Sequence, residues 1–188
     1  MKHTRLTREQ SREQTRERLL DAACAMFITK GFVGASVEDI ALAAGFTRGA
    51  FYSNFGDKAE LFVELLRRDH EKMQAGLRAI FDSPASREEM EARVLAYYSR
   101  ITSQNDACVL WAEAKLLATR DAGFGKRFNA FMREKHAELK AYIEEFSARV
   151  GTPLPMDPEI LVLGLIALGD GVQLLPTSDP VRVPAALV

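Results

Sequence analysis

The chain lacks the residue patterns that mark most enzymes of known chemistry. Its three histidines, His3, His70 and His136, lie far apart in the sequence. No HExxH or CxxC spacing, Gly-rich phosphate loop or nucleophile elbow occurs. These absences argue against a metal site, a nucleotide-phosphate site and a nucleophile with a catalytic base. We therefore expect no enzyme activity, no metal and no cofactor; a helical enzyme that uses an internal cavity is the least favoured alternative.

Cysteines and long apolar runs are also scarce. Two cysteines, Cys24 and Cys108, form no disulfide framework and fit a reducing compartment, with a thiol sensor as the open alternative. The N-terminus is charged and has no apolar central region of the kind found in signal peptides. The longest apolar run, residues 160–169, is ten residues long, which is too short for a membrane span. The expectation is a cytoplasmic protein with no membrane partner.

Charge is nearly balanced overall but unevenly distributed. The 188 residues have room for one or two domains with a substantial core, and their formal net charge is -1. Residues 1–58 hold 9 Lys and Arg against 7 Asp and Glu, whereas residues 59–188 hold 16 against 19. The first 18 residues are the most basic part. Two interpretations of them remain open: a mobile arm that reaches DNA phosphates or the minor groove, and a frayed, solvated terminus.

Residues 36–46 predict a short helix that ends in a tight turn. Ser36 is a good N-cap, and Asp39 lies near the capping-box position and the positive end of the helix. The helix is expected to begin at about Val37, because residues 37, 40, 41 and 44 are apolar at helical spacing. Gly45 then supplies a positive φ that other residues resist, so the turn consists of Gly45 and Phe46.

A second short helix and a long third one follow this turn. Thr47 is a good cap for the second helix, which is expected to run to about Asn54. Phe51 and Phe55 lie four residues apart on one face and are expected in the core, which leaves polar residues outside. Asp57 caps the third helix. Two short helices joined by a tight turn form a helix-turn-helix, so the hypothesis is sequence-specific DNA binding.

A series of short motifs runs without insertion between residues 15 and 62: Lys30-Gly31-Phe32, Ala35-Ser36-Val37, Asp39-Ile40-Ala41, Ala44-Gly45, Thr47-Arg48-Gly49, Phe51-Tyr52, Asn54-Phe55 and Lys58-Ala59-Glu60-Leu61-Phe62. With these motifs the stretch closely resembles the TetR family of bacterial transcriptional regulators. The rest of the chain is similar to the family only in helical content and length.

The resemblance implies roles for individual residues. In this family the second helix of the motif enters the major groove, its first turn meets bases, and flanking residues hold phosphates. Arg48 is the candidate for a bidentate contact to guanine or a contact to phosphate, and Gly49 lets the backbone approach the DNA unless it is a tolerated substitution. For Tyr52 and Lys58 a half-buried aromatic and an ordinary solvated lysine are the alternatives to phosphate contacts. The full set of expected DNA-binding residues is Ser36, Thr47, Arg48, Gly49, Tyr52, Ser53, Asn54 and Lys58.

Helical patterns continue to the C-terminal part of the chain. Helices are expected at about residues 12–29, 57–80, 86–103, 106–119, 122–150 and 159–175. Asp157 is the expected cap of the last helix, with Pro158 at the first helical position; a linker at 151–155 precedes it and three prolines, at 176, 180 and 184, follow it. The expected fold is all-α. A three-helix helix-turn-helix DNA-binding domain with a basic N-terminal arm occupies residues 1–56, and a helical ligand-binding and dimerisation domain occupies residues 57–188. The helix that begins at Asp57 belongs to both.

Two partners are expected for the second domain. The helix at 159–175 is apolar nearly all round, which favours a subunit interface, and the resembled family pairs its last two helices in a homodimer. A proline-punctuated tail stands where a final long helix is expected, so either that helix is missing or the dimer is built differently. The family also implies an apolar cavity for a small-molecule inducer. Tyr97, Trp111 and Phe128 are the candidate ligand contacts, with plain core packing as the alternative.

The implied function is a cytoplasmic, DNA-binding transcriptional regulator, with repression as the family's usual mode and activation left open. It would bind an inverted-repeat operator in double-stranded DNA as a homodimer. An apolar organic ligand would release it by changing the separation of the recognition helices. The alternatives are a constitutive DNA-binding protein without inducer and, less favoured, the helical enzyme named above.

Overall fold

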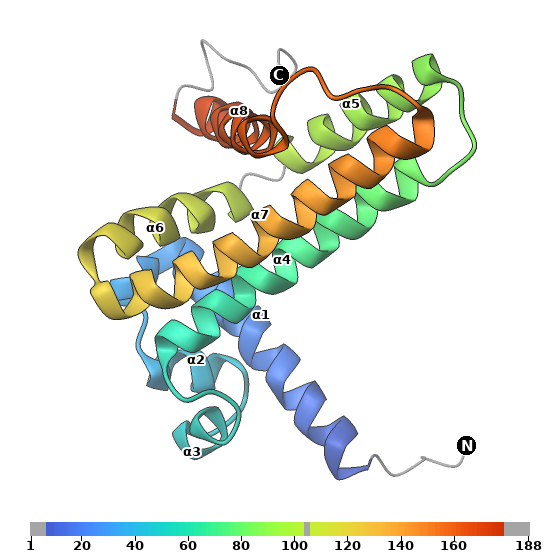
Figure 1. Cartoon of the computed structure of the whole chain (residues 1–188). Coiled ribbons are helices and arrows are strands. Elements are labelled where there is room, and N and C mark those ends of the chain that lie inside the picture. The colour runs from blue at the N-terminus through green and yellow to red at the C-terminus, as the bar shows by residue number, and fades with distance from the viewer. Residues whose placement is uncertain (1–6, 104–105, 179–188) are drawn as a thin grey trace. The chain divides into compact units, whose positions relative to one another are not determined.

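The computed structural model describes residues 7–103 and 106–178. These residues form no strand and the following helices, shown in Figure 1: α1 (Arg8–Gly34), α2 (Val37–Ala43), α3 (Arg48–Tyr52), α4 (Lys58–Phe81), α5 (Arg87–Ser103), α6 (Asp106–Arg120), α7 (Ala122–Val150) and α8 (Pro158–Ser178). The prediction of an all-α fold is confirmed. The backbone divides into two compact units, Met1–His70 and Glu71–Val188.

The division between the units falls inside α4 rather than before it. The first turns of α4 bury large apolar side chains, among them Leu61, Phe62 and Leu66. Phe62 packs against Phe27 of α1 with 4.9 Å between the ring centroids. This half of α4 therefore completes the core of the N-terminal unit. That is why the boundary lies later than the expected one at residues 56 and 57.

Helix α1 is longer than the sequence patterns predicted. It begins at Arg8 because Thr7 and Gln10 form a capping box: the Gln10 N–H donates to Thr7 Oγ1 at 3.1 Å and the Thr7 N–H donates to Gln10 Oε1 at 2.9 Å. At its other end Gly31 has φ 72° and kinks the helix before it stops at Gly34. From Arg8 onward the expected mobile arm is thus helical. Residues 1–6 of that arm lie outside the described residues.

The C-terminal unit is a group of packed helices. Helices α6 and α7 pack on each other and both contact α8. The last turns of α4 lie along α7, where Phe81 meets Phe146 at 5.4 Å between ring centroids and Asp82 pairs with Arg149 at 3.1 Å. Helix α7 ends at Val150 and is capped by Gly151, whose φ of 65° suits glycine. The predicted bounds of α7, residues 122–150, are those of the structure.

Helix α8 differs from the prediction in length and in exposure. It continues past residue 175 to Ser178 and includes Pro176, which removes only one donor when it stands in a last turn. The other two prolines of the tail, Pro180 and Pro184, lie outside the described residues. Val162 is buried, but most of the apolar side chains of α8 are exposed. Within the described part of the chain, α8 is also the helix whose length and composition would suffice to cross a membrane. Of the residues of its apolar segment, Pro158–Leu175, 6% are buried.

Candidate nucleic-acid interface

The two ends of α2 are set by local hydrogen bonds. Ser36 Oγ accepts from the Asp39 N–H at 3.0 Å, as expected of an N-cap. A hydrogen bond from the Lys30 side chain, followed by those from Ser36, lowers the pKa of the Asp39 carboxyl. After α2, Gly45 has φ 77° and the Phe46 N–H donates back to a carbonyl of α2 at 2.8 Å. The tight turn predicted at Gly45 and Phe46 is therefore present.

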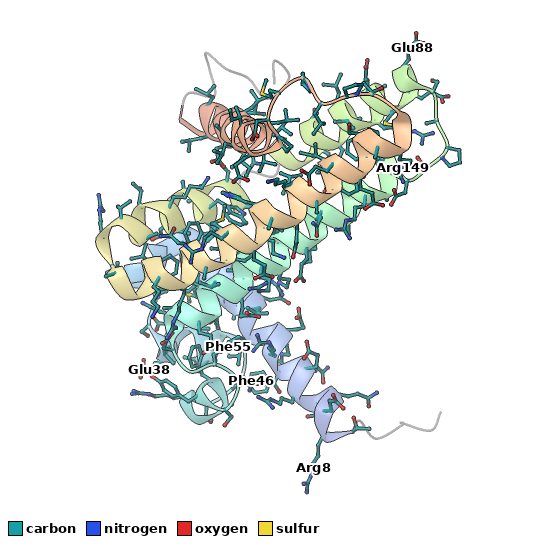
Figure 2. The ribbon with its side chains drawn as sticks, in the orientation of Figure 1. Arg8, Glu38, Phe46, Phe55, Glu88 and Arg149 are labelled. Atoms are coloured by element: carbon teal, nitrogen blue, oxygen red, sulfur yellow. The ribbon has the colours of Figure 1, made fainter. Side chains whose placement is uncertain are left out.

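Helix α3 is capped by the residue before it, Thr47, and is held in the core by aromatic side chains. Thr47 Oγ1 accepts from the Ala50 N–H at 3.3 Å. Phe51 and Phe55 are 0% and 1% exposed, which confirms that they belong to the core. Figure 2 labels both Phe55, which is buried, and Phe46, which is half-buried, in the N-terminal unit. Because one face of the helix is buried, its other residues are turned to solvent.

The exposed face of α3 carries most of the residues that the resemblance singled out. Thr47, Arg48, Gly49 and Ser53 are exposed, and Tyr52 is 47% exposed. Arg48 Nη1 lies 2.6 Å from Glu38 Oε1, and its guanidinium stands over the Tyr52 ring at 5.4 Å. A hydrogen bond with Tyr52, followed by the charge of Glu38, raises the pKa of the Arg48 guanidinium. An exposed arginine beside an exposed tyrosine is a surface that suits phosphate and base edges.

Ser53 and Asn54 lie at the end of α3 and bond back into the helix. Helix α3 ends at Tyr52, two residues earlier than predicted. Ser53 Oγ donates to the Gly49 carbonyl at 2.9 Å, and Asn54 Nδ2 donates to the Ala50 carbonyl at 2.8 Å. These side chains therefore use donors within α3, and their contacts to DNA stay a prediction.

Lys58, at the start of α4, joins two parts of the N-terminal unit. Its Nζ donates to the carbonyls of Phe32 and Ala35 at 2.6 Å and 2.7 Å and lies 4.4 Å from the centroid of the Phe32 ring. Two of the three donors of its ammonium group are thus engaged by backbone carbonyls. The predicted phosphate contact is untested, whereas the two carbonyl bonds give Lys58 a structural role that its sequence neighbours did not indicate.

Two arginines that the sequence placed in the basic arm pack on the motif instead. Arg16 donates to the Asn54 carbonyl at 3.1 Å, pairs with Glu64 of α4 at 2.6 Å and stands 4.4 Å over the Phe55 ring. Arg18 stands 4.8 Å over the Phe46 ring. The basic residues 16 and 18 thus position α3 and the turn before it. The sequence places these two arginines on α1, but it does not indicate their contacts, because the contacted residues are distant in the chain.

The three candidate ligand residues fall into two groups in the C-terminal unit. Trp111 of α6 lies against α7, with ring centroids 6.5 Å from Phe128 and 6.1 Å from Phe131. Tyr97 of α5 lies against α4: its hydroxyl donates to the Met73 carbonyl at 2.9 Å. The structure therefore brings Trp111 and Phe128 together and holds Tyr97 at a separate helix crossing. Among the described residues no group of three His, Cys, Asp or Glu is placed to hold a metal ion.

Comparisons with known proteins agree with this arrangement. Residues 19–65 match the family described as bacterial regulatory proteins, tetR family. An HTH-type transcriptional repressor of Mycobacterium tuberculosis, Rv1474c, is 30% identical over 178 residues, which cover 92% of this chain and 88% of that protein. Other curated relatives match over a shorter part, and the chain spans 26%, 42% and 54% of the length of three of them.

Solved structures share the fold at lower identity. A crystal structure from Rhodococcus sp., assigned to the TetR family of transcriptional regulators, is 18% identical, covers 93% of this chain and 92% of its own, and superposes with a TM-score of 0.77. The transcriptional regulator FadR of Bacillus subtilis, in complex with stearoyl-CoA, is 16% identical, with 90% of each chain covered and a TM-score of 0.68. At these identities the likeness concerns the fold alone.

Proposed function

Because the chain belongs to the tetR family of bacterial regulatory proteins, we propose that it is a cytoplasmic transcriptional repressor. It binds an inverted-repeat operator as a homodimer and leaves it when an apolar small molecule binds the C-terminal unit. The observation that carries the proposal is the outward face of α3, where Arg48 and Tyr52 are exposed while Phe51 and Phe55 are buried. A capped helix that anchors one face in a core and offers a cation on the other has the geometry of a recognition helix.

The DNA contacts are tested with two substitutions and a control. The DNA is an inverted repeat taken from the protein's own genomic neighbourhood. Arg48→Ala and Tyr52→Phe should both weaken binding, whereas Arg120→Ala, which removes an exposed arginine at the end of α6, should not. If Arg48 contacts a phosphate, the salt slope falls by about 1; if it contacts guanine, base preference relaxes at one position of each half-site. Unchanged affinity and salt slope in both variants would show that the contact assignments are wrong.

The proposal of a homodimer is supported by the exposed stripe of α8. Ile160, Leu168 and Leu175 are exposed and share a face with Gly164 and Gly171, at which an added Cβ would meet nothing within 4 Å. A contiguous apolar helix face in water favours association with a like surface. An inverted-repeat operator is read by a dimer whose recognition helices lie one DNA turn apart, about 34–36 Å. Leu168→Glu should shift sedimentation toward the monomer, while Leu95→Glu on α5 should leave it unchanged.

The ligand proposal is supported by an aromatic cluster between α6 and α7, formed by Trp111, Phe128 and Phe131. Trp111 is the chain's single tryptophan, so its fluorescence reports on this cluster without any substitution. We take stearoyl-CoA as the first probe, because FadR of Bacillus subtilis holds it. Binding should quench or shift the Trp111 emission, Phe128→Ala should weaken it, and the same titration should dissociate the operator complex. Operator binding that no apolar ligand alters would favour the constitutive DNA-binding protein.

Coupling between the ligand and the DNA would run through α4. This helix contributes Leu61 and Phe62 to the core of the N-terminal unit and Phe81 to the contact with α7. A ligand that moves α7 would thereby act on the element that supports α3. The ligand lowers operator affinity only to the extent that it binds the DNA-bound conformation of the protein more weakly than the conformation released from DNA.

A further inference from the structure

Two acidic residues begin α2, and each is paired with a cation. Asp39 pairs with Lys30 of α1 at 3.2 Å. Glu38 reaches α3 instead, where its Oε1 lies 2.6 Å from Arg48 Nη1. Figure 2 labels Glu38 at the outer edge of the N-terminal unit. The side chains of Glu38 and Arg48 are 54% and 64% exposed, so the ion pair lies on the surface proposed to meet DNA.

The guanidinium of Arg48 is held by two neighbours. Glu38 contacts it from α2, and the Tyr52 ring, one turn further along α3, stands 5.4 Å from its Cζ. An exposed arginine otherwise samples many rotamers and must be ordered when it binds. Contacts from a carboxylate and a ring restrict that sampling before DNA arrives. The exposed face of α3 is therefore preorganised at Arg48.

The charge of Glu38 affects how this surface can bind DNA. Near DNA, an unpaired Glu38 would be repelled by the phosphates. The pair of Glu38 and Arg48 carries no net charge. The guanidinium has five N–H groups, of which the pair with Glu38 and the hydrogen bond with Tyr52 engage two. A bidentate contact to guanine needs two donors. The intact pair can therefore still read a base.

We propose that Glu38 is a positioning residue that holds Arg48 for a base contact and disfavours binding to unrelated DNA. The proposal rests on the proposed function, in which Arg48 contacts the operator. If Arg48 swings away to a phosphate, Glu38 is left unpaired beside the DNA backbone. If it meets the correct base, the pair persists. Glu38 thus weakens binding to unrelated DNA more than binding to the operator, and so raises the ratio of specific to non-specific affinity.

The test compares Glu38→Gln with Asp39→Asn, which removes the same unit charge from the same turn of α2 but leaves the pair with Arg48 intact. The wild-type protein first selects its preferred sequence from duplexes with a randomised central segment. Affinities are then measured for the selected duplex and for an unrelated duplex of equal length, over a range of salt. Glu38→Gln should lower the ratio of the two affinities about tenfold, the size of one base contact.

Two further readouts separate positioning from a general charge effect. Glu38→Gln should broaden the base preference at one position of each half-site when the selection is repeated. Asp39→Asn should raise both affinities alike and keep the preference. If circular dichroism finds Glu38→Gln unfolded, Glu38→Asp replaces it. That variant keeps the charge one methylene further from Arg48 and should broaden the preference less.

Each outcome bears on a stated claim. If Glu38→Gln behaves as Asp39→Asn does, or Glu38→Asp keeps the full preference, the positioning role is overturned while selection by the wild type still supports the regulator. If the wild type selects no inverted repeat, the proposed function fails first, and the role of Glu38 fails with it.

Discussion

Replacing Arg16 by methionine should destabilise the N-terminal unit, because one guanidinium joins α1 to the end of α3 and to α4. Its bond to the Asn54 carbonyl is half-buried, and charged hydrogen bonds of this kind contribute about 1.5–3 kcal/mol. The ion pair with Glu64 is partly exposed and adds about 0.2–1 kcal/mol, and the contact with the Phe55 ring about 0.5–1 kcal/mol. Because these contacts share one side chain, their loss should cost roughly 2–4 kcal/mol in total.

Urea unfolding followed by circular dichroism measures this loss directly. A lower midpoint with an unchanged m-value is the expected result, together with a fall in Tm of about 5–15 °C. The matched control is Arg12→Met, which removes an exposed arginine one turn earlier on α1 and should change stability by about 0.5 kcal/mol or less. Operator affinity should fall further than folding alone explains, since the Asn54 carbonyl anchors the end of α3. Equal stability of the Arg16 and Arg12 variants would refute the reasoning.

Three more predictions concern single contacts. Lys58→Met leaves two backbone carbonyls without their donor and should lower the free energy of unfolding by about 1.5–3 kcal/mol, measured in urea. Gly76→Ala would place a Cβ 2.5 Å from the Tyr97 ring and should cost about 1–3 kcal/mol in the same assay. The lowered pKa of Asp39 gives stability that is fully present above the ordinary value of 3.8 and is lost as the pH falls through the lowered one. Asp39→Asn should therefore flatten the acid limb of a stability curve measured against pH.

The helix bounds that the sequence predicted well are those with local signals. Asp57 precedes α4, and its carboxylate accepts from the Glu60 N–H at 2.7 Å as a cap should. Asp157 and Pro158 likewise mark the start of α8. The start of α1 was missed although Thr7 and Gln10 carry a capping-box signal, because the apolar stripe used to place the helix begins later.

The contacts that join distant segments were not predictable from one sequence. Arg16 and Glu64 are 48 residues apart, and Lys58 meets carbonyls 23 and 26 residues earlier. Periodicity places such residues on a helix face, but it does not say which other helix lies opposite. The pair of Glu38 and Arg48 was missed for the same reason: its ten-residue separation spans the turn, whose geometry decides the distance between the two side chains.

Because α3 is short, it depends on contacts with the rest of the N-terminal unit for its stability. A helix of five residues has almost no stability of its own, since the first turn fixes several residues for one hydrogen bond. Its conformation therefore depends on the Thr47 cap, the buried rings of Phe51 and Phe55, and the Arg16 bond at its end. Substitutions in that support should alter DNA binding without touching DNA. The recognition surface is consequently as rigid as the contacts that α1 and α4 make beneath it.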